Sequence, residues 1–262
     1  MRFFQSKQKD APFAGALHKR TLHKNLEFTA AEQYKLLRTN LAFTIPVRTK
    51  CPVIGVTSAM RGEGKSTTAV NLSYVLAEKG SRVLLIDGDL RIPSIAKKMN
   101  IPAAPGLTDM LMEKHDQLED YKSSLLDTWY IVPSGNIPPN PSELLGSKRM
   151  ASVLKTLRKS FDYIIIDLPP VNLVSDALSI SNLITGMIVV VREDYTEKKE
   201  LERCFRQLKL SNVKVLGCVM NAAKSGGSSY GKYKKYKYYK YYKHYSHYGN
   251  FETETDLEGS KK

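Results

Sequence analysis

A short glycine-rich segment, residues 59–67, carries the clearest chemistry in the sequence. It reads Ala-Met-Arg-Gly-Glu-Gly-Lys-Ser-Thr, which is the phosphate-binding pattern G-x-x-x-x-G-K-[ST] with Ala59 in place of the first glycine. An apolar strand pattern precedes it and a helical pattern follows it. Gly62 and Gly64 allow successive backbone N–H groups to face phosphate oxygens, and the helix N-terminus adds partial positive charge. The segment therefore predicts a nucleotide site.

The polar residues of this segment have separate expected roles. Lys65 reaches the β- and γ-phosphates, the Ser66 hydroxyl binds Mg²⁺, and Thr67 caps the helix or touches the α-phosphate. ATP and Mg²⁺ are the cofactors that these residues imply. Asn221, which ends the last predicted strand, is expected either to recognise the adenine base or to form a turn. The residues expected to bind the nucleotide are Ala59, Met60, Arg61, Gly62, Glu63, Gly64, Lys65, Ser66, Thr67 and Asn221.

Three aspartates follow apolar strand patterns. Asp87 and Asp89 lie in the stretch Val83–Arg91, and Asp167 follows Tyr163-Ile-Ile-Ile, which is a Walker B pattern. Ligands of doubly wound sheets bind at the carboxyl ends of the strands. A single Asp after a strand often only caps a helix or forms a turn, but three of them beside a phosphate-binding loop favour a metal site. We expect Ser66, Asp87 and Asp167 to bind Mg²⁺.

The segment Tyr230–Tyr248 is a dense array of phenols and ammonium groups. Nine of its residues are tyrosine and six are lysine, with no Leu, Ile, Val, Met or Phe, so we expect a disordered tail. A nucleotide site and tethered phosphate acceptors on one chain suggest a kinase that modifies its own end. Asp89 is the expected catalytic base beside Lys65, with Asp87 as the alternative. The expected acceptors are Tyr230, Tyr233, Tyr236, Tyr238, Tyr239, Tyr241, Tyr242, Tyr245 and Tyr248.

Strand and helix patterns alternate between the two ends of the chain. Near-continuous Val/Ile runs separated by helical segments predict an α/β fold with a doubly wound, mostly parallel sheet of the P-loop NTPase kind. We expect a flexible basic segment at 1–27, a P-loop domain at 28–224, and a linker with the tyrosine-rich tail at 225–262. The predicted strands are 53–57, 83–86, 129–132, 163–166, 187–191 and 213–220, and the predicted helices are 28–43, 65–79, 140–159, 176–184 and 196–210.

Net charge, cysteine content and hydropathy indicate the cellular compartment and the kinds of partner that the chain could have. The net charge is +14, and the seven lysines of residues 224–248, where no acidic residue occurs, supply half of it. Such a basic segment either meets an anionic surface or keeps a mobile end in solution. Three cysteines without metal spacing favour a reducing cytosol. Because no run of about 18 apolar residues occurs, we expect no membrane span, and any membrane role then needs a separate protein.

The motifs together resemble those of the bacterial tyrosine kinases that control capsule and exopolysaccharide synthesis. The resemblance covers roughly residues 28–250. Ser58–Thr67 looks like Walker A of that family, Val83–Arg91 like its additional Walker A′ motif, and Ile164–Pro170 like Walker B. Pro138–Leu145 also resembles a stretch typical of the family. Asp-Gly-Asp-x-Arg within Walker A′ is the most specific of these, because P-loop proteins in general lack it.

The resemblance implies partners and a location. It implies autophosphorylation of the C-terminal tyrosines between neighbouring subunits of a ring, with a cognate tyrosine phosphatase. In the Gram-positive branch a separate membrane-spanning activator, of the polysaccharide co-polymerase or chain-length regulator type, recruits the cytoplasmic kinase to the inner face of the plasma membrane. The family's ring motif Glu-x-x-Arg-x-x-Arg reads Glu32-x-x-Lys35-x-x-Arg38 here, and Lys35 lacks the planar fork of arginine.

Two alternatives have different chemistry. A membrane-associated partitioning-type ATPase hydrolyses ATP without tyrosine transfer, but that branch places a signature lysine where this chain has Met60. A binding module would use the Lys/Tyr segment to contact nucleic acid or polysaccharide. The kinase interpretation, which we favour, needs no nucleic-acid partner.

Overall fold

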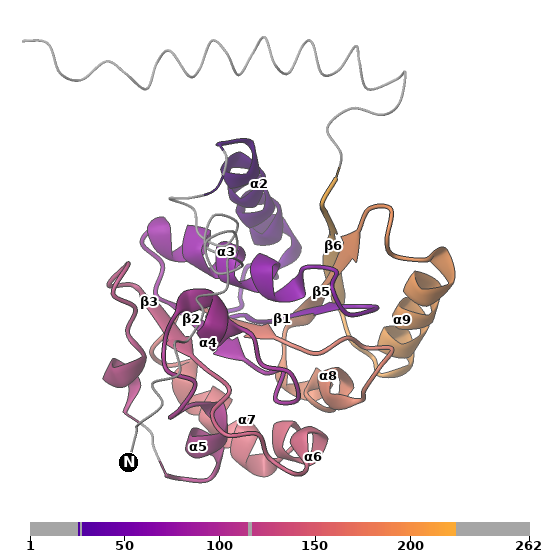
Figure 1. Cartoon of the computed structure of the whole chain (residues 1–262). Coiled ribbons are helices and arrows are strands. Elements are labelled where there is room, and N and C mark those ends of the chain that lie inside the picture. Colours follow the sequence, from indigo (N-terminus) through magenta and orange to yellow (C-terminus); the bar gives the residue numbers. More distant parts are fainter. Residues whose placement is uncertain (1–25, 27, 115–116, 224–262) are drawn as a thin grey trace, which may run out of the picture. The chain divides into compact units, whose positions relative to one another are not determined.

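The computed structural model describes residues 26, 28–114 and 117–223 (Figure 1). The elements given below belong to the unit Met1–Asn221. The tail tyrosines, the glycine-rich linker and the basic residues 1–25 lie outside the described residues.

Six parallel strands form the central sheet in the order β3-β2-β4-β1-β5-β6 (Figure 1). Strands β4 and β1 lie at the centre of the sheet. Consecutive strands are connected through helical segments, because parallel strands require crossover connections. This confirms the predicted fold class. The strands are β1 (Val53–Ser58), β2 (Val83–Asp87), β3 (Trp129–Val132), β4 (Tyr163–Asp167), β5 (Gly186–Arg192) and β6 (Val215–Asn221).

Helices cover both faces of this sheet (Figure 1). Consecutive strand residues point to opposite faces, so Leu84 packs into one core and Leu85 into the other. The core with Leu85 includes α2, α3 and α4, and the core with Leu84 includes α5 to α9. The helices are α2 (Phe28–Thr44), α3 (Lys65–Glu78), α4 (Ile95–Met99), α5 (Leu107–Leu111), α6 (Pro141–Leu145), α7 (Lys148–Leu157), α8 (Asp176–Ser179) and α9 (Lys198–Leu210), with short 3-10 turns at Leu118–Tyr121 and Ser181–Leu183.

The predicted helix at 140–159 is wrong in one respect, because the structure divides it into α6 and α7. Gly146 ends α6, and Ser147 begins a new helix by accepting a hydrogen bond from the Met150 N–H at 3.0 Å. A serine N-cap satisfies one of the free amides of a helix start. The predicted helix at 176–184 likewise shortens to α8. The five-residue helices α4 and α5 escaped prediction because one turn shows no periodicity.

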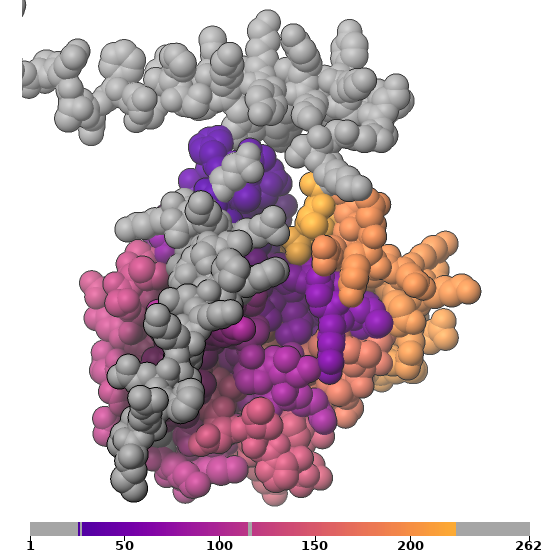
Figure 2. Space-filling model, viewed as in Figure 1, coloured from indigo at the N-terminus to yellow at the C-terminus, as the bar shows by residue number. Residues whose placement is uncertain are grey.

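Helix α2 lies against α3 and reaches the edge strand β6. The Lys214 ammonium, just before β6, donates to the Thr44 carbonyl at 3.3 Å. In the space-filling view α2 protrudes in indigo beside the yellow-orange end of β6 (Figure 2). Its outer side carries apolar groups, since Phe43 is 84% exposed. Within the described residues, no helix combines the length and apolar character needed to cross a membrane.

Candidate active site

The glycine-rich loop connects β1 to α3 in a conformation that requires glycine. Gly62 and Gly64 have φ angles of 79° and 97°, in the left-handed region that L-residues rarely adopt. A Cβ on Gly64 would lie 2.0 Å from Nδ2 of Asn221. Lys65 is the first residue of α3, so the loop ends at a helix N-terminus. This arrangement is that of an anion-binding loop.

The remaining residues of the loop differ in exposure. Ala59 is fully buried and packs into the core, where a glycine would leave a small void. Met60 is partly buried against the same core, and Arg61 is exposed at the loop tip. Thr67 is half-buried in the first turn of α3. Glu63, in contrast, is completely buried.

The three predicted aspartates meet at one edge of the sheet because their strands are neighbours. Strand β4 pairs with both β2 and β1, and Asp87 lies directly opposite Asp167 in this register. The loop begins where β1 ends, beside Asp167. Asp87 and Asp167 are fully buried, and Asp89 is 5% exposed.

Lys65 joins the loop to these carboxylates. Its Nζ lies 2.8 Å from Asp89 Oδ2, 3.4 Å from Asp167 Oδ1 and 3.4 Å from Ser66 Oγ. Burial lowers the pKa of Lys65, but Asp167 and Asp89 raise it by more, so the pKa lies above its ordinary range. Lys65 is therefore a protonated cation held at the mouth of the loop.

Asp87 is held mainly by backbone amides. Its Oδ2 accepts from the N–H groups of Ser94 (3.0 Å) and Ile95 (2.9 Å) at the start of α4, and its Oδ1 accepts from the Asp89 N–H at 3.3 Å. Burial, together with the charge of Asp167, raises the pKa of Asp87 to about 7. Asp87 thus anchors the turn that carries Asp89.

Asp167 has a carboxylate oxygen that could act as a ligand of a metal ion. Its Oδ2 is buried and has no hydrogen-bond partner in the described part of the chain. Burial raises the pKa of this carboxyl, while Lys65 and Ser66 oppose the rise. An unpartnered buried carboxylate oxygen is costly, and a hard cation such as Mg²⁺ would satisfy it. Among the described residues, no three His, Cys, Asp or Glu side chains cluster as metal ligands.

Comparisons with known proteins agree with this geometry. Residues 51–214 match a family described as an AAA domain. Tyrosine-protein kinase YwqD of Bacillus subtilis is 39% identical over 202 residues, covering 77% of this chain and 85% of that protein. Tyrosine-protein kinase CpsD of Streptococcus pneumoniae serotype 4 is 36% identical over 213 residues, covering 79% and 92%. The chain belongs to the bacterial tyrosine-protein kinases.

Solved structures place this tyrosine kinase nearer to kinase domains than to division ATPases. The kinase domain of Escherichia coli tyrosine kinase ETK superposes with a TM-score of 0.67 at 28% identity, over 76% of this chain and 79% of that chain. The septum site-determining protein MinD of Pyrococcus horikoshii, complexed with Mg-ADP, gives 0.54 at 26%, over 65% and 70%. The kinase is an ATP-dependent phosphotransferase, so neither alternative from the sequence is supported.

One ion pair of the kinase was not predicted from the sequence. The Arg91 guanidinium binds the fully buried carboxylate of Asp176 through two bonds, Nε–Oδ2 at 2.8 Å and NH2–Oδ1 at 3.0 Å. Arg91 belongs to the Asp-Gly-Asp-x-Arg motif and Asp176 begins α8, after the Walker B segment. The pair connects the loop that follows β2 to the start of α8, which follows β4. Its partners are 85 residues apart in sequence, and no local pattern connects them.

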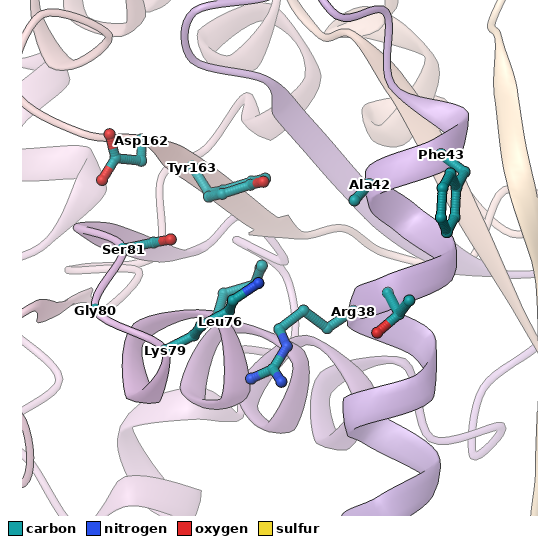
Figure 3. Close-up of a pocket in the computed structure, with 10 residues that line it drawn as sticks. Arg38, Ala42, Phe43, Leu76, Lys79, Gly80, Ser81, Asp162 and Tyr163 are labelled. Carbon is teal, nitrogen blue, oxygen red and sulfur yellow. The ribbon is translucent and has the colours of Figure 1, made fainter.

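The predicted ring residues Glu32, Lys35 and Arg38 lie along α2, and all three are engaged within the subunit. Lys35 Nζ pairs with Glu32 Oε1 at 2.8 Å, and Arg38 NH1 donates to the Val75 carbonyl of α3 at 2.6 Å. Arg38 also lines a pocket of about 500 Å³ with Lys79 and Tyr163 (Figure 3). Tyr163 begins β4 and Asp167 ends it, so this pocket lies at the amino ends of the strands, whereas the nucleotide loop lies at their carboxyl ends.

Proposed function

We propose that this kinase transfers the γ-phosphoryl group of ATP to the tyrosines of its own C-terminal segment. The observation that carries the proposal is the contact of Lys65 with Asp89 and Asp167 at the mouth of the loop. A phosphate-binding cation and a carboxylate able to accept a proton lie side by side there. The segment Tyr230–Tyr248 of the same chain supplies the phenols.

Ser66 and Asp167 would hold Mg²⁺, and Asp87 would join them through a water molecule because backbone amides already occupy its oxygens. The metal would neutralise charge on the transferring phosphoryl group. The loop amides and Lys65 would bind the phosphates from the other side. Lys65 would then exchange Asp89 for a phosphate oxygen, which frees Asp89 Oδ2.

Asp89 would act as the general base. The tyrosine hydroxyl, whose ordinary pKa is about 10, loses its proton to Asp89 as the bond from its oxygen to the γ-phosphorus forms. The bond between that phosphorus and the oxygen bridging to ADP breaks at the same time. Asp89 is held by the Ile92 N–H at 3.1 Å through its other oxygen, Oδ1, so its free oxygen has a fixed direction.

The chain between the last strand and the first tail tyrosine is long enough to reach such a site. The nine residues from Asn221 to Tyr230 extend to about 30 Å, which reaches the site of the same chain or of a neighbouring subunit. Each phosphotyrosine adds about −1.5 to −2 charges, so about four of them would offset the seven lysines of residues 224–248. We propose that this loss of positive charge loosens a ring of subunits.

We also propose the cellular setting that the family resemblance implies. The kinase would be cytoplasmic and bound to the inner face of the plasma membrane by a membrane-spanning activator. It would form a ring with Glu32, Lys35 and Arg38 at the interface, act opposite a tyrosine phosphatase, and regulate capsule or exopolysaccharide synthesis.

A variant with phenylalanine at the nine tail tyrosines tests the proposed acceptors. Purified wild-type and variant proteins are incubated with Mg-ATP and the cytosolic part of the activator, and both phosphotyrosine and released phosphate are measured. We expect the variant to lose phosphotyrosine and to keep ATP hydrolysis, with Lys65→Met as the inactive control. Unchanged phosphotyrosine in the variant would show that the acceptors lie elsewhere.

A further inference from the structure

Glu63 is a buried carboxylate in the middle of the nucleotide loop. Its neighbours Arg61 and Gly62 are exposed, whereas Glu63 itself is 0% exposed. The loop motif leaves this position open, because the phosphates are bound by backbone amides. A buried carboxylate is costly unless it is hydrogen-bonded. Glu63 therefore requires hydrogen-bond donors for both of its carboxylate oxygens.

Its two oxygens bind different parts of the chain. Oε2 accepts from the Met60 N–H at 2.7 Å, which closes the loop on itself. Oε1 accepts from the hydroxyl of Thr196, in the connection between β5 and α9. The Thr196 oxygen in turn accepts from the Arg192 N–H at 2.9 Å. Glu63 thus fixes the loop to a segment that is 133 residues away in sequence.

Two further bonds hold consecutive carbonyl groups of the loop. Arg192 NH1 donates to the Gly62 carbonyl at 3.1 Å, and Asn221 Nδ2 donates to the Glu63 carbonyl at 2.8 Å. In a planar trans peptide the C=O and the following N–H point in opposite directions. Holding these two oxygens from outside the loop therefore turns the N–H groups of Glu63 and Gly64 toward its concave side. That is the direction from which a phosphate is bound.

We propose that Arg192, Thr196 and Asn221, acting with Glu63, are positioning residues that set the loop amides for a triphosphate. We call these four residues the loop clamp. They act through the loop and not on the substrate. This function gives Asn221 a role other than reading adenine, and it rests on the nucleotide-binding part of the proposed function alone.

The clamp predicts a particular pattern of affinities. Dissociation constants for Mg-ATP and for Mg-tripolyphosphate, which has no base, are measured by calorimetry for the wild type and for Thr196→Val, Arg192→Met and Asn221→Ala. Losing one hydrogen bond to the loop should weaken both ligands by the same factor, about tenfold. Thr196→Ser, which keeps the hydroxyl, should restore wild-type affinity. Thr39→Val is the matched control, because the Thr39 hydroxyl donates to the Lys35 carbonyl within α2 and, in the described part of the chain, to no residue of the loop; it should change neither affinity.

Other readouts separate the clamp from a general loss of structure. Thr196→Val and Glu63→Ala should be non-additive in the free energy of ATP binding, because both remove the bond between Thr196 and Glu63. In the phosphorylation assay the KM for ATP should rise with kcat nearly unchanged. Equal affinities in all variants would overturn the proposal. A loss confined to ATP in Asn221→Ala, with tripolyphosphate unaffected, would instead assign Asn221 to the base. If Thr196→Val does not fold, Arg192→Met decides by the same two measurements. None of these binding results depends on tyrosine transfer.

Discussion

The ammonium of Lys65 lies 2.8 Å from Oδ2 of Asp89, so the lysine of the glycine-rich loop and the proposed base are hydrogen-bonded to each other. The pair is almost completely buried. Each group therefore holds the other in place. Binding of a phosphate by Lys65 would release Asp89 at the moment when a base is required.

Asp89→Asn tests this relationship. The amide keeps the size of the side chain and still accepts from Ile92, but it does not take a proton. We expect the kcat for tyrosine phosphorylation to fall by about 10²- to 10⁴-fold, with the dissociation constant for Mg-ATP within tenfold of wild type. Asp87→Asn is the comparison, because Asp87 was the alternative base. A greater loss of kcat in Asp87→Asn, with Asp89→Asn near wild type, would exchange the two roles.

Asp87 predicts a stability that falls with rising pH in the absence of Mg²⁺. Its pKa of about 7 in the folded protein exceeds that of an unfolded Asp, which is about 4. Between these values the native state holds a proton that the unfolded chain has released, so deprotonation favours unfolding. The free energy of unfolding should fall by up to about 1.4 kcal/mol per pH unit from this group.

Denaturant titrations of wild type and Asp87→Asn between pH 4 and 8 measure this contribution. The variant should gain stability relative to wild type as the pH rises from 4 to 7, and the difference should then level off. Asp127→Asn, at a carboxylate that is 94% exposed, should show no such trend. A difference that is constant with pH would contradict the raised pKa of Asp87.

The ion pair of Arg91 and Asp176 predicts an effect on stability. Arg91→Ala leaves a fully buried carboxylate without its bidentate partner, so we expect a loss of about 1–3 kcal/mol in the free energy of unfolding. Arg91→Lys keeps the charge without the fork and should be intermediate. Lys198→Ala, in an exposed pair with Glu202, should cost less than about 0.5 kcal/mol. Thermal and denaturant unfolding measure these changes. If the effects of Arg91→Ala and Asp176→Asn add in a double-mutant cycle, the two side chains are not coupled and the prediction is wrong.

Substitutions in α2 should distinguish effects on the assembly of subunits from effects on the stability of one subunit. Arg38→Ala removes the bond to the Val75 carbonyl and should destabilise the subunit by about 1 kcal/mol. Glu32→Ala and Lys35→Ala remove only a half-exposed pair within one helix, worth about 0.5 kcal/mol or less. If α2 forms the ring interface, these two variants should lower the mass measured by light scattering at unchanged stability. An unchanged mass would remove α2 from the proposed interface.

The sequence predicted the parts of the site that depend on local pattern. Val/Ile runs located the strands, and the carboxyl ends of parallel neighbours necessarily bring Asp87 and Asp167 to one edge. The two glycines and Lys65 predicted the loop because their spacing encodes its conformation. The break at Gly146 was missed because the helical pattern continues on both sides of it.

What the sequence did not reveal are contacts between distant segments. The bond of Glu63 to Thr196 and the pair of Arg91 with Asp176 depend on how the crossover connections fold back over the sheet. Both acids look like ordinary surface residues in sequence, and burial alone distinguishes them. The nine tail tyrosines lie outside the described residues, so their use as acceptors rests on composition and on the family.

The most direct test of tyrosine transfer is mass spectrometry of the intact protein after co-expression with its activator. We expect phosphate on one or more tyrosines between Tyr230 and Tyr248 in the wild type, and none in Lys65→Met, which loses the phosphate-binding cation but keeps the tail. Unmodified tail tyrosines in the wild type, under conditions where ATP is hydrolysed, would contradict the central claim.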